Sequence, residues 1–107
     1  MKRNVLNTNI EFRKGILFIR LDGILDKYTV NNLDDIYKFI NENNIKKIVF
    51  NLNEIKKIDE VGNNNLYNLY KKFIKNKVSC MFVDNDFITY KVNKIPNELK
   101  AMEVIWN

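Results

Sequence analysis

The sequence predicts a single α/β domain, with helices packed against a mixed, mainly parallel five-stranded sheet. Its 107 residues are the size of one ordinary domain, which we expect to span residues 1–107. Hydrophobic residues make up 46% of the chain and charged residues 29%, which is a globular rather than a disordered balance. Short apolar runs alternate with stripes of helical period, as in parallel strands joined by helical crossovers.

A hairpin is expected at the start of the chain. Residues 5–12 alternate loosely between apolar and polar side chains, and Lys14-Gly15 then makes a turn into the apolar run 16–21. That run is rich in β-forming residues, which favours a strand buried on both faces. We expect the first strand to be the antiparallel member of the sheet.

Two helical stripes follow, and each leads into a further strand. Thr29 is the expected N-cap of the first helix, which precedes a strand over 45–52. Gly62 introduces the second helix, which precedes a strand over 78–83. The two apolar stripes are Val30, Leu33, Ile36, Tyr37 and Ile40 in the first helix, and Leu66, Leu69, Tyr70 and Phe73 in the second.

A weak helix and a last strand are predicted at the end of the chain. We expect the helix over residues 87–92, a turn at Pro96 and the fifth strand over 102–106.

Composition argues against an enzyme and against a bound cofactor or metal ion. The chain has no histidine, which is the commonest general base and transition-metal ligand. Its single cysteine, Cys80, lies in an apolar run and is expected to behave as a small hydrophobic group. Gly15, Gly23 and Gly62 form neither a dinucleotide fingerprint nor a phosphate-binding loop.

The location expected from the sequence is the cytoplasm, without membrane insertion. The chain opens without a signal peptide, and no run reaches the roughly 18 apolar residues of a membrane span. The net charge of +5 comes from scattered lysines, which favours solubility over nucleic-acid binding. Nucleic-acid binding is kept as an alternative, carried by Lys71, Lys72, Lys75 and Lys77.

Asp59 and Glu60 are adjacent acids near the start of the second predicted helix. At that place we interpret them as favourable partners of the helix dipole. The alternative is an enzymatic magnesium site that combines them with Asp26, since hydrated magnesium needs only one or two carboxylates. We expect Asp26 and Asp59 to lie at the same end of the sheet, where strand ends lead into helix starts.

Two stretches resemble the signatures of STAS domains. Residues 21–26, with Thr29 and Leu33, resemble the pattern L-x-G-x-L-D-x-x-T-x-x-x-L, which joins the second strand to the first helix. Residues 48–55 running into 58–62 are similar to the family's strand and its D-S-S-G loop. The resemblance implies a STAS fold over nearly the whole chain.

The branch with this loop motif is that of the bacterial anti-sigma factor antagonists. In them the first serine of D-S-S-G is phosphorylated by an anti-sigma factor that is itself a serine kinase. The unphosphorylated domain binds that kinase and frees the sigma factor. The resemblance thus implies transcription regulation by partner switching, without catalysis and with such a kinase as partner. The partner-binding residues it implies are Asp26, Asp59, Glu60, Val61, Gly62 and Asn63.

The loop departs from the motif at the phosphorylated position. Glu60 and Val61 stand where the two serines would be, so neither position has a hydroxyl to accept a phosphate. One hypothesis is that Glu60 mimics the phosphorylated state with one charge instead of two; the other is a surface repurposed for a different partner. Asn51 also replaces the aspartate usual in its strand. A further alternative keeps the fold as a subunit or scaffold of another complex, a stress-signalling assembly or a lipid or anion transport ATPase.

Overall fold

The hairpin at the start of the chain forms one edge of the sheet. In the computed structural model, which describes residues 4–84, 88 and 90–104, β1 (Leu6–Arg13) and β2 (Ile16–Leu25) pair antiparallel. Lys14 and Gly15 connect them with φ values of 53° and 81°, and positive φ at both positions is what a tight two-residue hairpin turn requires. The predicted hairpin is confirmed, and β2 continues beyond the predicted end at residue 21.

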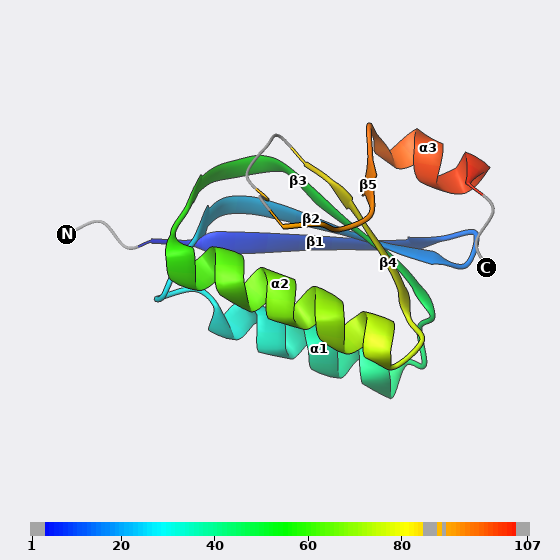
Figure 1. The fold of residues 1–107 in the computed structure, drawn as a ribbon, viewed down its shortest axis with the longest axis horizontal. Helices are drawn as coiled ribbons and strands as arrows, with labels where there is room; N and C mark the ends of the chain where they lie inside the picture. The colour runs from blue at the N-terminus through cyan, green and yellow to red at the C-terminus, as the bar shows by residue number, and fades with distance from the viewer. Residues whose placement is uncertain (1–3, 85–87, 89, 105–107) are drawn as a thin grey trace.

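Among the described residues, five strands form one mixed sheet in the order β1-β2-β3-β4-β5 (Figure 1). β3 (Lys47–Ile58), β4 (Ser79–Val83) and β5 (Lys94–Ile95) each run parallel to the preceding strand of the sheet. β1 is antiparallel to β2, as predicted. β3 extends well past the predicted end at residue 52, and its last residue, Ile58, lies directly before the loop that precedes the second helix.

Two helices, α1 (Asn31–Glu42) and α2 (Glu60–Lys75), lie side by side on one face of the sheet (Figure 1). Both buried stripes fall where the helical period predicts them. The rings of Phe50 and Phe82 stack in this core, with their centroids 5.4 Å apart. Cys80 is buried in the same core, and burial raises the pKa of its thiol. The core between helices and sheet includes Leu33, Ile36, Ile40, Leu66, Leu69 and Phe73 with Leu17, Ile19, Leu21, Ile48, Leu52 and Cys80. Within the described ranges, no helix is long and apolar enough to cross a membrane.

Thr29 is not the N-cap of α1, and that prediction is wrong. Val30 occupies the N-cap position and makes no side-chain capping bond. The Thr29 hydroxyl is buried in the preceding loop, where it donates to the carbonyl oxygen of Ile24 at 2.8 Å and accepts from the Asp26 N–H at 2.9 Å. Both bonds hold the β2–α1 loop, so the hydroxyl is not available to the first turn of the helix.

At the end of the chain the predicted turn at Pro96 is confirmed, because the backbone bends there between β5 and the following helix, but the predicted helix and last strand are wrong wherever the structure describes them. Ile88 and residues 90–92 are not helical, while Phe87 and Thr89 lie outside the described residues. In place of a strand over 102–106, a helix, α3 (Glu98–Glu103), runs through the start of that range, and residues 105–107 lie outside the described part.

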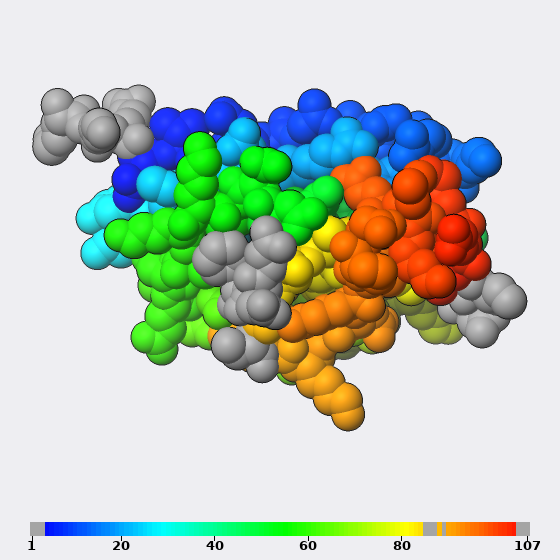
Figure 2. Space-filling view, turned by 90° about the horizontal axis from the view of Figure 1, so that it is seen from above, coloured from blue at the N-terminus to red at the C-terminus, as the bar shows by residue number. Residues whose placement is uncertain are grey.

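Capping and packing explain why α3 forms in place of a strand. Asn97 is extended, and its side-chain oxygen accepts from the Lys100 N–H at 2.9 Å, which satisfies one of the free donors of the first turn. Ala101 is fully buried against the second face of the sheet, in a small cluster with Phe18 and Val49. Figure 2 shows α3, in orange to red, covering one part of that face, whereas β3, in green, lies open beside it.

Candidate functional site

The candidate site lies where β2 and β3 end side by side. The two strands are parallel, and Leu25 of β2 is opposite Ile58 of β3. Asp26 therefore follows one strand directly beside Asp59, which follows the other. The Lys27 N–H donates to Asp59 Oδ2 at 3.2 Å, and the Asp59 N–H donates to the Leu25 carbonyl at 3.2 Å. The expected placement of Asp26 and Asp59 at one end of the sheet is confirmed.

Asp59 is the N-cap of α2 and also ties the two loops together. Its backbone is extended, and its Oδ1 accepts from the Gly62 N–H at 2.7 Å. Its carbonyl accepts from the Asn63 N–H at 2.9 Å, which is the first bond of the helix. Because Oδ2 accepts from Lys27, both carboxylate oxygens are engaged in holding the loops.

Asp26 is buried, with 8% of its surface exposed, and it organises the loop that follows β2. Its Oδ1 accepts from the N–H groups of Tyr28 at 2.9 Å and Thr29 at 3.2 Å, which is the hydrogen bonding of an Asx turn. Its Oδ2 accepts from the side-chain amide of Asn4. The carboxylate thus faces inward, so Asp26 shapes the surface more than it contributes to it.

Gly62 allows the start of α2 to pack directly on the end of β2. A Cβ at this position would lie 2.3 Å from the Leu25 carbonyl oxygen, closer than real Cβ atoms come to any neighbour. The residue is buried and helical, so its glycine is required by close approach and not by an unusual backbone angle. The close approach explains why a glycine stands at the start of this helix.

Glu60 and Val61 occupy the first positions of α2 and are exposed, Val61 to 40%. Tyr28 is 71% exposed in the neighbouring loop, and the Lys27 ammonium lies 5.1 Å from its ring centre. Tyr28 is not among the site residues predicted from the sequence. Its position two residues after Asp26 does not by itself predict exposure, because the direction of the side chain depends on the hydrogen bonds of the loop. We name the group formed by Tyr28, Glu60, Val61 and the half-buried Asn63 the strand-end surface.

The structure does not bring a metal-binding set together at this end of the sheet. Within residues 4–84, 88 and 90–104, no group of three or more acidic, histidine or cysteine side chains is placed to hold an ion. Of the three acids considered for magnesium, Asp26 and Asp59 already accept backbone hydrogen bonds. Glu60 is exposed at the helix start beside them.

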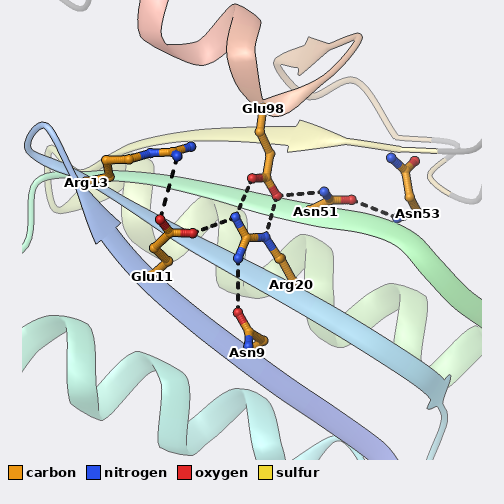
Figure 3. Close-up of polar contacts among 7 residues, drawn as sticks. All are labelled: Asn9, Glu11, Arg13, Arg20, Asn51, Asn53 and Glu98. Atoms are coloured by element: carbon orange, nitrogen blue, oxygen red, sulfur yellow. Dashed lines mark hydrogen bonds and ion pairs between the residues drawn. The ribbon is translucent and has the colours of Figure 1, made fainter.

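A second polar cluster, on the other face of the sheet, was not predicted (Figure 3). Arg20 of β2 binds Glu98 of α3 with two hydrogen bonds of 2.7 and 2.8 Å, and it also contacts Glu11 at 2.8 Å. The Asn51 amide donates to Glu98 at 2.7 Å. An aspartate at position 51 would present an oxygen to that carboxylate instead of a donor, which gives the asparagine a local physical reason.

Arg20 also sets the ionisation of Glu98. Hydrogen bonds from Arg20 lower the pKa of the Glu98 carboxyl, against the opposing effect of partial burial, and the Asn51 amide adds to the lowering. The same pairing raises the pKa of the Arg20 guanidinium. The ion pair anchors α3 to the sheet, although Glu98 lies 78 residues after Arg20 in the chain.

The fold and the site define the class of this protein: a mixed α/β domain whose candidate site is a surface formed by two strand-end loops. The chain belongs to the STAS domain family, whose model matches residues 7–92. This membership confirms the resemblance noted in the two sequence signatures.

Several solved structures have the same fold. The anti-sigma factor antagonist SpoIIAA in its unphosphorylated form matches with a TM-score of 0.72 and 15% identity, over 91% of this chain and 96% of SpoIIAA. An anti-sigma factor antagonist from Mycobacterium paratuberculosis matches with a TM-score of 0.64 and 19% identity, over 73% of this chain and 66% of that one. A protein called Mglu matches at 0.67 and 20% identity over 75% of this chain, which spans only 20% of Mglu. The predicted fold class is confirmed.

Proposed function

We propose that this domain is a non-catalytic regulatory module that binds a protein partner through the strand-end surface, in the manner of an anti-sigma factor antagonist. Membership of the STAS family and the shared fold with two such antagonists support a regulatory, protein-binding role. The observation that carries the finer proposal is the place of Glu60, exposed at the first position of α2, directly after the capping residue Asp59.

Glu60 supplies a permanent negative charge where the antagonists of this family receive a phosphate. A helix start favours negative charge, because its free N–H groups and the helix dipole present a partial positive charge. A phosphate would add nearly two charges there, and a glutamate adds one. The proposal is that Glu60 holds the strand-end surface in the equivalent of the phosphorylated, released state, with an anti-sigma factor serine kinase as the partner released.

The absence of a hydroxyl at positions 60 and 61 distinguishes this surface from a switchable one. Val61 and Tyr28 add exposed apolar area beside the charge, which a partner would bury. In this account the loop keeps the geometry of a docking surface, because Asp26, Asp59 and Gly62 hold the two loops together, while the charge of Glu60 opposes docking.

The test uses purified anti-sigma factor serine kinases from the source organism and the variant Glu60→Ser. With ADP present, calorimetric titration is expected to show binding of this variant at least tenfold tighter than that of the wild type, which corresponds to about 1.4 kcal/mol. With ATP, intact-mass measurement should show one phosphate on the variant and none on the wild type. Glu42→Ser is the matched control, since it removes an exposed glutamate at the far end of α1 and should leave binding unchanged.

Two results would count against the proposal. Tight binding of a kinase by the wild type would mean that Glu60 does not act as an off state, and the repurposed-surface hypothesis would replace it. If Glu60→Ser neither binds nor accepts phosphate from any of these kinases, the antagonist-type role itself falls.

A further inference from the structure

An apolar groove follows the edge of the sheet between β1 and α1. Ile10, Phe12 and Phe39 line it, above Leu17 and Ile45. These first three side chains are 41%, 61% and 39% exposed, and they are three of the eight large hydrophobic side chains exposed among the described residues. Such a gathering on one stretch of surface indicates an interaction site more strongly than scattered exposed residues do.

The outer edge of β1 offers backbone groups to a further strand. β1 is the terminal strand of the sheet, and no described strand pairs with its outer side. The Val5 carbonyl accepts from the Ile24 N–H at 2.9 Å. Since alternate residues of an antiparallel strand bond to the same neighbour, the intervening ones direct their N–H and C=O outward. The residues of β1 whose backbone N–H and C=O groups point away from β2 are Leu6, Thr8, Ile10 and Phe12.

Charge, which blocks unwanted pairing at many sheet edges, is confined in β1 to Glu11 and Arg13, whose backbone groups face β2. None of its four outward residues is charged or a proline, and the strand is eight residues long. The opposite edge, β5, has only two residues and is protected by its shortness. The same outward residues of β1 border the groove, so a strand added at this edge would also cover apolar side chains.

We propose that β1 pairs antiparallel with β1 of a second copy of this chain, so that two sheets join across a two-fold axis and each copy covers part of the other's groove. With the axis at Ile10, the two Ile10 side chains meet and Phe12 lies opposite Thr8 of the second copy. On the other face, Glu11 lies opposite Asn9 and Arg13 opposite Asn7. This register brings no like charges opposite one another.

Charge at the two ends of the groove favours a second copy as the occupant. α1 runs beside β1 in the same direction, with Asp35 near Leu6 at one end and Asn43 near Phe12 at the other. The hairpin turn at the second end carries Lys14, which is exposed. Antiparallel pairing around Ile10 brings Lys14 of one copy to Leu6, and thus toward Asp35, of the other. The two-fold axis repeats this attraction, so the groove is complementary to itself.

Sedimentation velocity of the full chain, from micromolar to submillimolar concentration, tests the proposal. The wild type is expected to show a monomer–dimer equilibrium. Ile10→Lys should raise the dimer dissociation constant at least tenfold, because it places two ammonium groups face to face at the axis. The matched control is Leu99→Lys, since Leu99 is a 69% exposed apolar residue on α3, away from the groove; it should dimerise like the wild type.

A charge exchange tests the register independently of any loss of stability. Lys14→Glu and Asp35→Lys should each raise the dissociation constant about fivefold, as expected for two exposed ion pairs, and the double variant should return it to near the wild-type value. Circular dichroism confirms that each variant is folded. If the wild type stays monomeric over the whole concentration range, the proposal is overturned, and an extended segment of another protein becomes the occupant of the groove. Equal behaviour of Ile10→Lys and Leu99→Lys, or a double variant weaker than both single ones, also overturns it.

Discussion

Substitution of Gly62 by alanine is expected to destabilise the domain, although alanine is the better helix former. In the first turn of α2 the change would gain up to about 1 kcal/mol from helix propensity. The new Cβ, however, would lie 2.3 Å from the carbonyl oxygen of Leu25 and 2.8 Å from its carbonyl carbon. Both atoms belong to the backbone of β2, so no side-chain rotation relieves the overlap.

The size of the effect follows from how far α2 must move. Ordinary contact begins at 3.4 Å, so the helix start and the end of β2 must separate by about 1 Å. That separation stretches the 3.2 Å hydrogen bond from the Asp59 N–H to the Leu25 carbonyl. Overpacking costs about 1–3 kcal/mol and the weakened hydrogen bond about 1 kcal/mol. After the propensity gain, the expected net loss is about 2 kcal/mol, or about 10 °C in Tm.

Urea unfolding followed by circular dichroism measures this loss. Asn68→Ala serves as the matched control, because Asn68 is exposed on the same helix and should gain a few tenths of a kcal/mol from propensity alone. If both alanine variants are stabilised to the same extent, the close approach of α2 to β2 is not a constraint and the reasoning for Gly62 is refuted.

Substitutions at three further positions test the contacts that hold the site and α3. Glu98→Gln should cost about 1–2 kcal/mol at neutral pH by weakening the ion pair with Arg20. Because Arg20 lowers the pKa of Glu98, the ion pair stabilises the fold fully above the unfolded pKa of about 4.3, and this stabilisation is lost as the pH falls through the lower folded pKa. Urea unfolding at pH 7 and pH 3 should therefore show that the difference in stability between the wild type and Glu98→Gln shrinks in acid. Asp59→Ala should cost about 1–2 kcal/mol in the same assay through loss of the α2 cap, and Asp59→Asn much less; equal losses would rule out capping as its role. Thr29→Val should cost about 2 kcal/mol by leaving the Ile24 carbonyl and the Asp26 N–H without their buried partner, whereas a change within 0.5 kcal/mol would show that the hydroxyl does not hold the loop.

Periodicity and turn chemistry were sufficient to predict most of the fold. The Lys14-Gly15 turn and the apolar run after it predicted the hairpin, because both signals are local. The stripes of α1 and α2 were equally readable, since a helix that covers a sheet must bury one face. The end of the chain was misread because residues 102–106 are rich in strand-forming side chains. In the structure, the Asn97 cap and the packing of Ala101 decide in favour of a helix.

The candidate site was predictable in its placement and less so in the roles of its residues. Asp26 and Asp59 could be assigned to one end of the sheet because parallel strands bring their carboxyl ends together. That Asp26 turns inward while Tyr28 turns outward depends on the hydrogen bonds of the loop, which no spacing rule specifies. Arg20 and Glu98 are 78 positions apart in the sequence, so no local sequence pattern predicts their ion pair.

The affinity of Glu60→Gln for an anti-sigma factor serine kinase of the source organism, measured with ADP beside the wild type, tests the central claim most directly. Glutamine keeps the size of the side chain and removes its charge, so the comparison isolates the charge at the start of α2. The account predicts that the glutamine variant binds at least tenfold more tightly than the wild type, a difference of about 1.4 kcal/mol. Equal affinities, or tighter binding by the wild type, would contradict the claim that Glu60 holds the strand-end surface in the released state.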